Sequence, residues 1–161
     1  MKQVLVFDID DTLILHTNER INHYNHPNRN TYLKDLIEEL KSDKVYIYTN
    51  GTYGHGKAVV DNLYLPVNGI FARDNIPFMK PLIQSFDYVG RRISEEVQGD
   101  SEYYFFDDQL DNLKTAKEKG WKTIWISPHF TMNYSFVDYS FPNIYQALVV
   151  FIIQKELIKR E

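Results

Sequence analysis

The sequence predicts a three-layer, doubly wound α/β domain of the Rossmann-like type, built on a mainly parallel five-stranded sheet. Short apolar segments rich in β-branched and aromatic residues alternate with segments of helical periodicity along residues 4–126. The connections between successive strands are all short enough for single crossover units, which favours parallel pairing. The 161 residues suit one domain, residues 1–161, and contain no repeat and no linker that would divide them.

The amino-terminal half begins with a strand at residues 4–7. Residues 14–30 are rich in Asn and His and are not periodic, so we expect a loop or a small flap there. Its three histidines fit no usual zinc-ligand spacing and are expected at the surface; they are His16, His23 and His26. The elements expected next are a helix at 31–42, a strand at 44–48, a helix at about 57–65 and a strand at 69–72.

The carboxyl-terminal half continues the alternation. Pro81 suits the first position of a helix, whose inward stripe is Leu82, Phe86, Val89 and Ile93. The following elements are a strand at 102–106, a helix at about 110–119 that Gly120 ends, and a strand at 122–126. A short strand near 137–141 is compatible with the pattern. Residues 143–160 are expected to form a helix, apolar nearly all round its middle, that packs into the core or an oligomer interface.

Composition and charge narrow the classes of function. A net charge of −4 without a Lys/Arg block argues against a broad nucleic-acid surface. The longest apolar run, residues 147–153, is too short to span a membrane. There is no cysteine for disulfide or thiol chemistry. The first strand begins too early to leave room for a signal peptide, so we expect a cytoplasmic protein.

The first strand ends in a cluster of carboxylates formed by Asp8, Asp10 and Asp11. Neighbouring carboxylates repel, so one must be protonated or a cation must lie among them. This end of a strand is also where ligands bind in open α/β sheets. A solvated turn or a helix cap is the ordinary alternative. A calcium loop of the EF-hand type is rejected because Leu13 occupies the position that needs glycine and because a strand precedes the loop.

Three further polar stretches are expected at the same edge of the sheet. They are Thr49-Asn50 after the second strand, Lys80 before a helix, and Asp107-Asp108 with Asn112 after the fourth strand. Each alone has an ordinary explanation: a turn residue, a solvated lysine and a helix cap, respectively. Four such stretches in this order on one parallel sheet are hard to explain as accidents, and together they indicate a binding or catalytic site.

In this order the four stretches resemble the motifs of the haloacid dehalogenase-like (HAD) superfamily, the aspartate-nucleophile phosphatases. FDIDDTL at residues 7–13 is similar to the first motif and YTN at 48–50 to the second. MKP at 79–81 is similar to the third and FFDDQLDNL at 105–113 to the fourth. Within the superfamily, the residues of the last three motifs are similar to those of the pyrimidine 5′-nucleotidase branch. The resemblance covers residues 4–126 and implies a HAD-like form of the predicted fold.

The resemblance implies a Mg²⁺-dependent phosphomonoesterase. Asp8 would be the nucleophile and would form an aspartyl-phosphate intermediate. Asp10 would protonate the leaving oxygen and later take a proton from the attacking water. Its backbone carbonyl, rather than its side chain, would be a metal ligand. Because a halide leaves without an acid and an alkoxide needs one, Asp10 also favours phosphoryl transfer over carbon–halogen cleavage.

The remaining motif residues are given binding roles by the same resemblance. Asp8 and Asp108 would supply carboxylate oxygens to Mg²⁺, with Asp107 close by. Asn112 would orient that metal shell. The residues expected to contact the phosphoryl group are Thr49, Asn50, Gly51 and Lys80, and the lysine would also neutralise charge on the nucleophile.

The spacing of the motifs leaves little or no room for a cap domain. About 35 residues separate Leu13 from Thr49 and about 30 separate Thr49 from Lys80, and core elements use most of both. An open site is compatible with a nucleoside monophosphate or another small phosphomonoester. It is equally compatible with a macromolecular phosphate, on a phosphoprotein or a nucleic-acid end, or with a homo-oligomer that covers the site. Non-hydrolytic phosphotransfer and a scaffold role on the same fold remain as alternatives.

Overall fold

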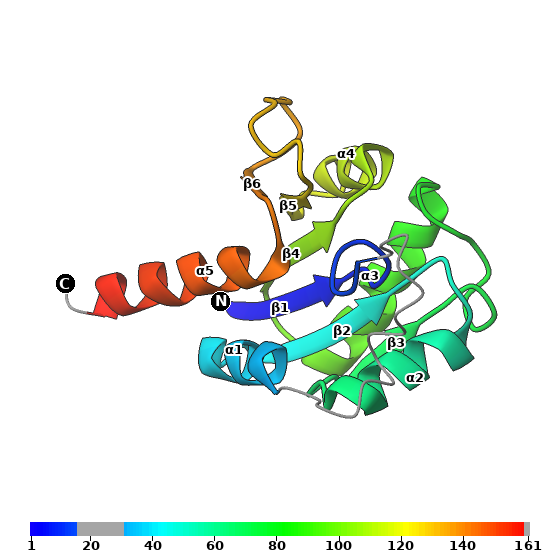
Figure 1. The fold of residues 1–161 in the computed structure, drawn as a ribbon. Coiled ribbons are helices and arrows are strands. Elements are labelled where there is room, and N and C mark those ends of the chain that lie inside the picture. The colour runs from blue at the N-terminus through cyan, green and yellow to red at the C-terminus, as the bar shows by residue number, and fades with distance from the viewer. Residues whose placement is uncertain (16–30, 160–161) are drawn as a thin grey trace.

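The structure is a computed structural model that describes residues 1–15 and 31–159. Within these residues a single sheet of six strands has the order β3-β2-β1-β4-β5-β6 (Figure 1). Every neighbouring pair is parallel. The strands are β1 (Lys2–Phe7), β2 (Lys44–Tyr48), β3 (Gly69–Phe71), β4 (Ser101–Asp107), β5 (Lys122–Ile126) and β6 (Tyr139–Phe141). The predicted parallel α/β architecture is therefore confirmed.

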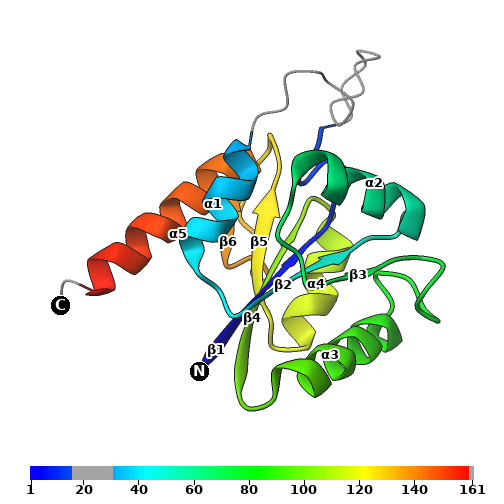
Figure 2. The same cartoon turned by 90° about the horizontal axis from the view of Figure 1, so that it is seen from below.

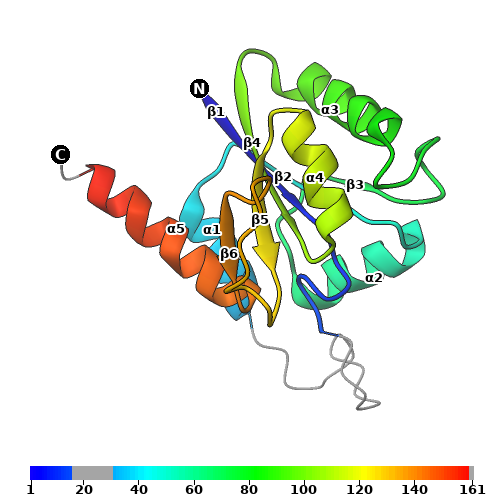
Figure 3. The ribbon, with the colours of Figure 1, turned by 90° about the horizontal axis from the view of Figure 1, so that it is seen from above.

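Helices cover both faces of the sheet and make the fold three-layered. The helices are α1 (Tyr32–Leu40), α2 (Tyr53–Leu63), α3 (Ile83–Val97), α4 (Leu110–Glu118) and α5 (Ile144–Lys159). Apolar side chains of α1, α2 and α5 pack on one face of the sheet, and those of α3 and α4 pack on the other. Figures 2 and 3 show α1 and α5 side by side and α3 with α4 on the opposite side.

The position of β1 inside the sheet explains why its sequence from Val4 to Phe7 is apolar at every position and does not alternate with polar residues. Leu5 and Phe7 belong to the core beneath α1 and α5, whereas Val4 and Val6 belong to the core beneath α3. Successive side chains of a strand point to opposite faces, so a strand covered on both faces needs apolar residues at every position. The strand is thus fixed between two cores, and the residue that follows it has a defined position.

The structure corrects the predicted sheet and one helix start. The sheet has six strands rather than five, because β6 pairs with β5 at the edge; three residues are too few to show a period of two. The helix expected at about 57–65 begins at Tyr53, where Thr52 caps it by accepting from the backbone N–H of His55. That cap outweighs the low helix propensity of Gly54 and Gly56.

The predicted start of α3 is also corrected, and the predicted packing of α5 into the core holds for only part of the helix. Pro81 does not occupy the first helical position, because α3 begins at Ile83 and Leu82 is its N-terminal flanking residue. Helix α5 is buried only in its first half, where Ala147 and Leu148 are fully covered.

The carboxyl-terminal turns of α5 extend beyond the sheet (Figure 1) and expose three apolar side chains, Ile153, Leu157 and Ile158. An oligomer interface at this helix stays a prediction. None of the described helices is both long enough and apolar enough to cross a membrane. Most of the flap expected at 14–30, with its three histidines, lies outside the described residues.

Candidate active site

The polar stretches predicted from the sequence converge at one edge of the sheet. The adjacent strands β1, β2 and β4 end there and are followed by Asp8, Thr49 and Asp108, respectively. Lys80 reaches the same place from the segment between β3 and α3. A cavity of about 180 Å³ opens at this edge. Eight of the nine residues expected at the site line it: Asp8, Asp10, Thr49, Asn50, Gly51, Lys80, Asp108 and Asn112.

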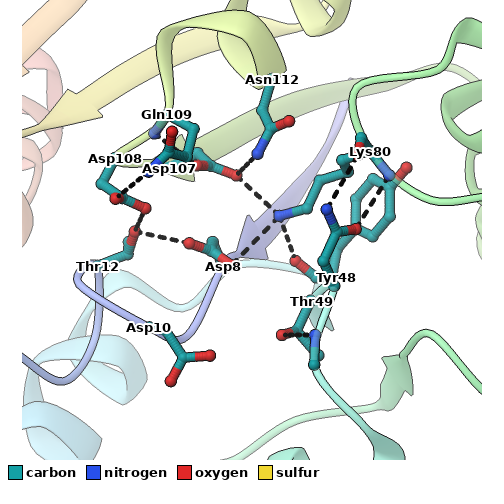
Figure 4. Close-up of polar contacts among 12 residues, drawn as sticks. Asp8, Asp10, Thr12, Tyr48, Thr49, Lys80, Asp107, Asp108, Gln109 and Asn112 are labelled. Atoms are coloured by element: carbon teal, nitrogen blue, oxygen red, sulfur yellow. Dashed lines mark hydrogen bonds and ion pairs between the residues drawn. The ribbon is translucent and has the colours of Figure 1, made fainter. Parts of the chain in front are cut away.

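Lys80 is the centre of a buried charge network (Figure 4). Its Nζ donates to Asp107 Oδ2 at 2.8 Å, to Asp8 Oδ1 at 3.2 Å and to the backbone carbonyl of Tyr48 at 2.8 Å. An ammonium group has three donors, and here all three have partners. Burial lowers the pKa of Lys80, but the charges of Asp107 and Asp8 outweigh burial, so the net shift is upward and the group keeps its proton.

The carboxylates around Lys80 carry more negative charge than one lysine can balance. Burial raises the pKa of Asp8 to about 6, although Lys80 acts to lower it. Burial likewise raises the pKa of Asp107 to about 6, and it raises the pKa of Asp108 above its usual value. Carboxylate oxygens of these three residues lie within 4.8 Å of one another. Such a group of hard oxygen donors suits a divalent cation such as Mg²⁺.

Neighbouring polar groups fix the orientation of these carboxylates. Asp107 accepts at Oδ1 from the backbone N–H of Gln109, 2.8 Å away, and at Oδ2 from Asn112 Nδ2, 3.1 Å away. The Gln109 side chain donates to Asp108 Oδ2 at 3.0 Å. Both oxygens of Asp107 are thus occupied within the protein. Asp107 lies behind the cavity rather than in its lining, and its expected place close to the metal stays a prediction.

Thr12 links the first and fourth motifs. Its Oγ1 lies 3.1 Å from Asp8 Oδ2 and 3.3 Å from Asp108 Oδ1, so its single hydroxyl proton can be donated to either carboxylate. Thr12 and Gln109 were not expected to contact these carboxylates. Thr12 lies within the first motif, which is the signal that could have identified it. Gln109 directly follows Asp107 and Asp108 in the sequence, and it can therefore donate hydrogen bonds to both.

The second motif holds the third in position. Asn50 Nδ2 donates to the backbone carbonyl of Lys80 at 2.9 Å, and Asn50 Oδ1 accepts from the backbone N–H of Lys80 at 3.0 Å. Because this side chain is occupied, a contact from Asn50 to substrate would have to come from its backbone. Thr49 Oγ1 lies at the cavity and accepts from the backbone N–H of Gly51 at 3.0 Å.

Asp10 lies on the open side of the cavity, away from Lys80 (Figure 4). Its Oδ1 is 2.8 Å from Nε2 of His55, and the Asp10 and His55 side chains are 34% and 26% exposed, respectively. Sequence reasoning missed His55 because it placed this residue before the helix. Once α2 begins at Tyr53, His55 falls in the first turn of the helix, next to the site.

Comparison with known proteins places this geometry in a fold family. No protein-family model and no curated protein matches the chain. Among solved structures, the chain is similar to Bacillus subtilis YfnB, described as a HAD-hydrolase bound to magnesium, with a TM-score of 0.60 and 24% identity. That match covers 73% of this chain and 53% of YfnB, so the chain spans about half of the YfnB structure.

Two further structures are similar. The core domain of a Streptococcus pneumoniae protein, described as a phosphoglycolate phosphatase, matches with a TM-score of 0.61 and 15% identity over 94% of this chain and 96% of its own. The Xanthobacter autotrophicus L-2-haloacid dehalogenase matches with a TM-score of 0.56 and 16% identity over 73% and 58% of the two chains, respectively. The nearly full-length match to a core domain agrees with the small cap predicted from the sequence. The chain therefore has the haloacid dehalogenase-like hydrolase fold.

Proposed function

We propose that this chain is a Mg²⁺-dependent phosphomonoesterase that uses Asp8 as its nucleophile. The observation that supports this most is the position of Asp8. It is buried at the end of β1, hydrogen-bonded to the Lys80 ammonium, and next to a second carboxylate that has room for a cation. Asp10, two residues further on, borders the same cavity. A nucleophile and an acid/base group are therefore available at one phosphoryl-sized cavity.

The residues present fit a Mg²⁺ ion. Three carboxylates face one lysine, and burial raises the pKa of each, so a cation among them would favour their ionised forms. Asp8 and Asp108 would hold Mg²⁺ through carboxylate oxygens, and the backbone carbonyl of Asp10 is a further candidate ligand. When bound, the ion would supply positive charge between the Asp8 carboxylate and a phosphomonoester dianion.

The residues of the chain account for the two halves of the reaction. Ionised Asp8 attacks phosphorus, the bond from phosphorus to the leaving oxygen breaks, and Asp10 gives a proton to that oxygen. Water then attacks the phosphorus of the aspartyl-phosphate while Asp10 takes a proton from the water. The bond from phosphorus to Asp8 breaks, inorganic phosphate leaves, and the Asp8 carboxylate is restored. With its pKa raised to about 6, Asp8 is mostly ionised at pH 7. Lys80 stays charged and stabilises charge on the nucleophile and the transferring group.

The cavity has room for a phosphoryl group. At about 180 Å³, and lined by polar residues, it opens to the surface, where the rest of a nucleoside monophosphate or another phosphomonoester would lie. A phosphate on a macromolecule is the second candidate substrate. It is supported by the open setting of the cavity and by the exposed side chains of Phe78 and Met79 beside Lys80. Both substrates require the same chemistry at Asp8 and Asp10.

The test is phosphate release by purified protein with and without Mg²⁺. The substrates are an aryl phosphate, nucleoside monophosphates, a phosphopeptide and a phosphorylated oligonucleotide, and an Asp8→Asn variant is assayed in parallel. We expect Mg²⁺-dependent release that the variant lacks, and the preferred substrate will distinguish the two candidates. Release that persists in Asp8→Asn would contradict Asp8 as nucleophile. No release from any substrate would contradict hydrolysis, and acid-labile phosphate on Asp8 would then indicate phosphotransfer.

A further inference from the structure

His55 is placed at the site by the start of helix α2. Its backbone N–H donates to Thr52 Oγ1 at 3.2 Å, which closes the first turn of the helix. Its ring Nε2 lies 2.8 Å from Asp10 Oδ1. The imidazole therefore approaches the Asp10 carboxyl group from a rigid element, and it does so without lining the cavity itself.

The backbone of Asp10 is fixed separately from its side chain. The turn after β1 is closed by the backbone N–H of Asp11, which donates to the carbonyl of Ile14 at 2.6 Å, and by that of Thr12, which donates to Ile9 at 3.1 Å. These bonds set the position of the Cα atom of Asp10 but leave the rotation of its side chain to other contacts. A partly exposed carboxyl group rotates readily unless a neighbour selects one rotamer.

The two oxygens of Asp10 face different surroundings. Oδ1 meets His55, whereas Oδ2 lies toward the segment that carries Thr49 and Gly51. A side-chain carbon placed on Gly51 would lie 3.7 Å from Asp10 Oδ2 and 3.3 Å from Thr49 Oγ1. The same carbon would lie 3.4 Å from the His55 ring. Oδ2 therefore lies near the segment of Thr49 and Gly51, and both of these residues line the cavity.

We propose that His55 is a positioning residue for Asp10. A hydrogen on Nε2 is donated to Asp10 Oδ1, and this bond keeps Oδ2 directed at the leaving oxygen of the substrate. Oδ2 then carries the proton that passes to the leaving group, and His55 itself does not touch the substrate. This inference rests on the proposed phosphomonoesterase function, and it assigns a role to a residue outside the four motifs.

The leaving group provides a sharp test. An alkoxide leaving group needs a proton from Asp10, whereas 4-nitrophenolate leaves readily without one. In His55→Phe, which keeps a ring but removes the donor, we expect kcat/KM for an alkyl phosphate to fall about 10²-fold. We expect kcat/KM for 4-nitrophenyl phosphate to change less than about threefold. This ratio reports only the steps up to departure of the leaving group, so slow hydrolysis of the aspartyl-phosphate does not affect it.

Two variants separate positioning from a structural effect. His55→Gln places an amide donor near the position of Nε2, and we expect it to recover kcat/KM for the alkyl phosphate to within about tenfold of wild type. Lys57→Met is the matched control. It removes an exposed ion pair with Asp61 on the same helix, 2.7 Å long, and leaves Asp10 untouched. We expect it to leave both kcat/KM values unchanged. Thermal unfolding of all variants would show whether α2 remains folded.

The outcomes distinguish this inference from the function on which it rests. Wild-type protein that releases no phosphate from either substrate would overturn both. Active wild-type protein with equal losses for the two substrates in His55→Phe, or with no loss for either, would overturn the role of His55 alone. A selective loss for the alkyl phosphate that His55→Gln reverses would support it.

Discussion

The two sides of the candidate active site hold their carboxylates by different means. On the buried side, Asp107 is inaccessible and Asp8 nearly so, and both bind the Lys80 ammonium. On the open side, Asp10 is about one-third exposed and meets His55. Water screens charges on the open side, whereas each buried charge has lost its hydration and depends on its partners. Substitutions on the buried side should therefore change both the activity and the free energy of unfolding, whereas substitutions on the open side should change the activity alone.

The largest effect on turnover that leaves stability unchanged is expected for Asp10→Asn. The amide cannot donate a carboxylic proton or act as a base, so kcat for an alkyl phosphate should fall about 10²- to 10⁴-fold. Because the site is partly solvated and the shape is kept, the free energy of unfolding should change by less than about 0.5 kcal/mol. Steady-state kinetics and urea unfolding measure the two quantities. Destabilisation by more than about 1 kcal/mol would show that Asp10 also has a structural role.

Lys80→Met should reduce both kcat and the free energy of unfolding. It removes the only described cation among the carboxylates of Asp8 and Asp107, and we expect kcat to fall about 10²- to 10³-fold. Loss of one partner from a buried ion pair costs about 3–5 kcal/mol, because the other charge stays buried without compensation.

The matched control for Lys80→Met is the double variant Lys80→Met/Asp8→Asn, which also removes one of the stranded charges. It should recover part of the lost stability in urea unfolding but none of the activity. A double variant no more stable than Lys80→Met would contradict the electrostatic account of the buried side.

Asn112→Leu tests whether the hydrogen bond that orients Asp107 strengthens the binding of Mg²⁺. The Asn112 amide donates from Nδ2 to Asp107 Oδ2, and Asn112 lies in the first turn of α4. Removal of such a supporting bond typically weakens metal binding, and we expect the Mg²⁺ concentration for half-maximal activity to rise about 10- to 100-fold. Lys114→Met, an exposed change on the same helix, serves as the control. Equal Mg²⁺ dependence in both variants would argue against this role for Asn112.

The last prediction concerns the stability of the metal-free protein at different pH values. Because burial raises the pKa of Asp8 from 3.8 to about 6, the folded state binds more protons than the unfolded state between these values. The corresponding stabilisation is fully present below about pH 3.8 and is lost as the pH rises through about 6. A shift of this size corresponds to at most about 3 kcal/mol.

Urea unfolding in a chelator between pH 4.5 and pH 7.5 would measure this loss. The difference in stability between wild type and Asp8→Asn isolates the contribution of Asp8, because the remaining carboxylates titrate in both proteins. As the pH rises, the free energy of unfolding of Asp8→Asn should increase relative to that of wild type. Added Mg²⁺ should reduce this difference, because it pairs with the ionised carboxylates of wild type. A difference that does not depend on pH would contradict the raised pKa of Asp8.

Most strands of the sheet and the helices on both of its faces could be predicted, because the sequence patterns that indicate them are local. The strands β1, β2 and β5 contain runs of buried residues, and the four buried residues of α1 recur at helical spacing: Leu33, Leu36, Ile37 and Leu40. The weak points were short or unusual segments. Strand β6 has three residues, and α2 begins with two glycines in its first turn and a half. There, pairing at the sheet edge and a Thr52 cap decide the structure.

The sequence by itself determined the fold class and the chemical types gathered at the site. Residues that directly follow strands of one parallel sheet must meet at one edge, so Asp8, Thr49 and Asp108 could be placed together from the sequence. Only the tertiary structure decided which partner each group has. Lys80 reaches Asp8 across 72 positions, and His55 reaches Asp10 across 45. Such contacts depend on how loops and helix starts pack around the sheet, and no local pattern encodes that packing.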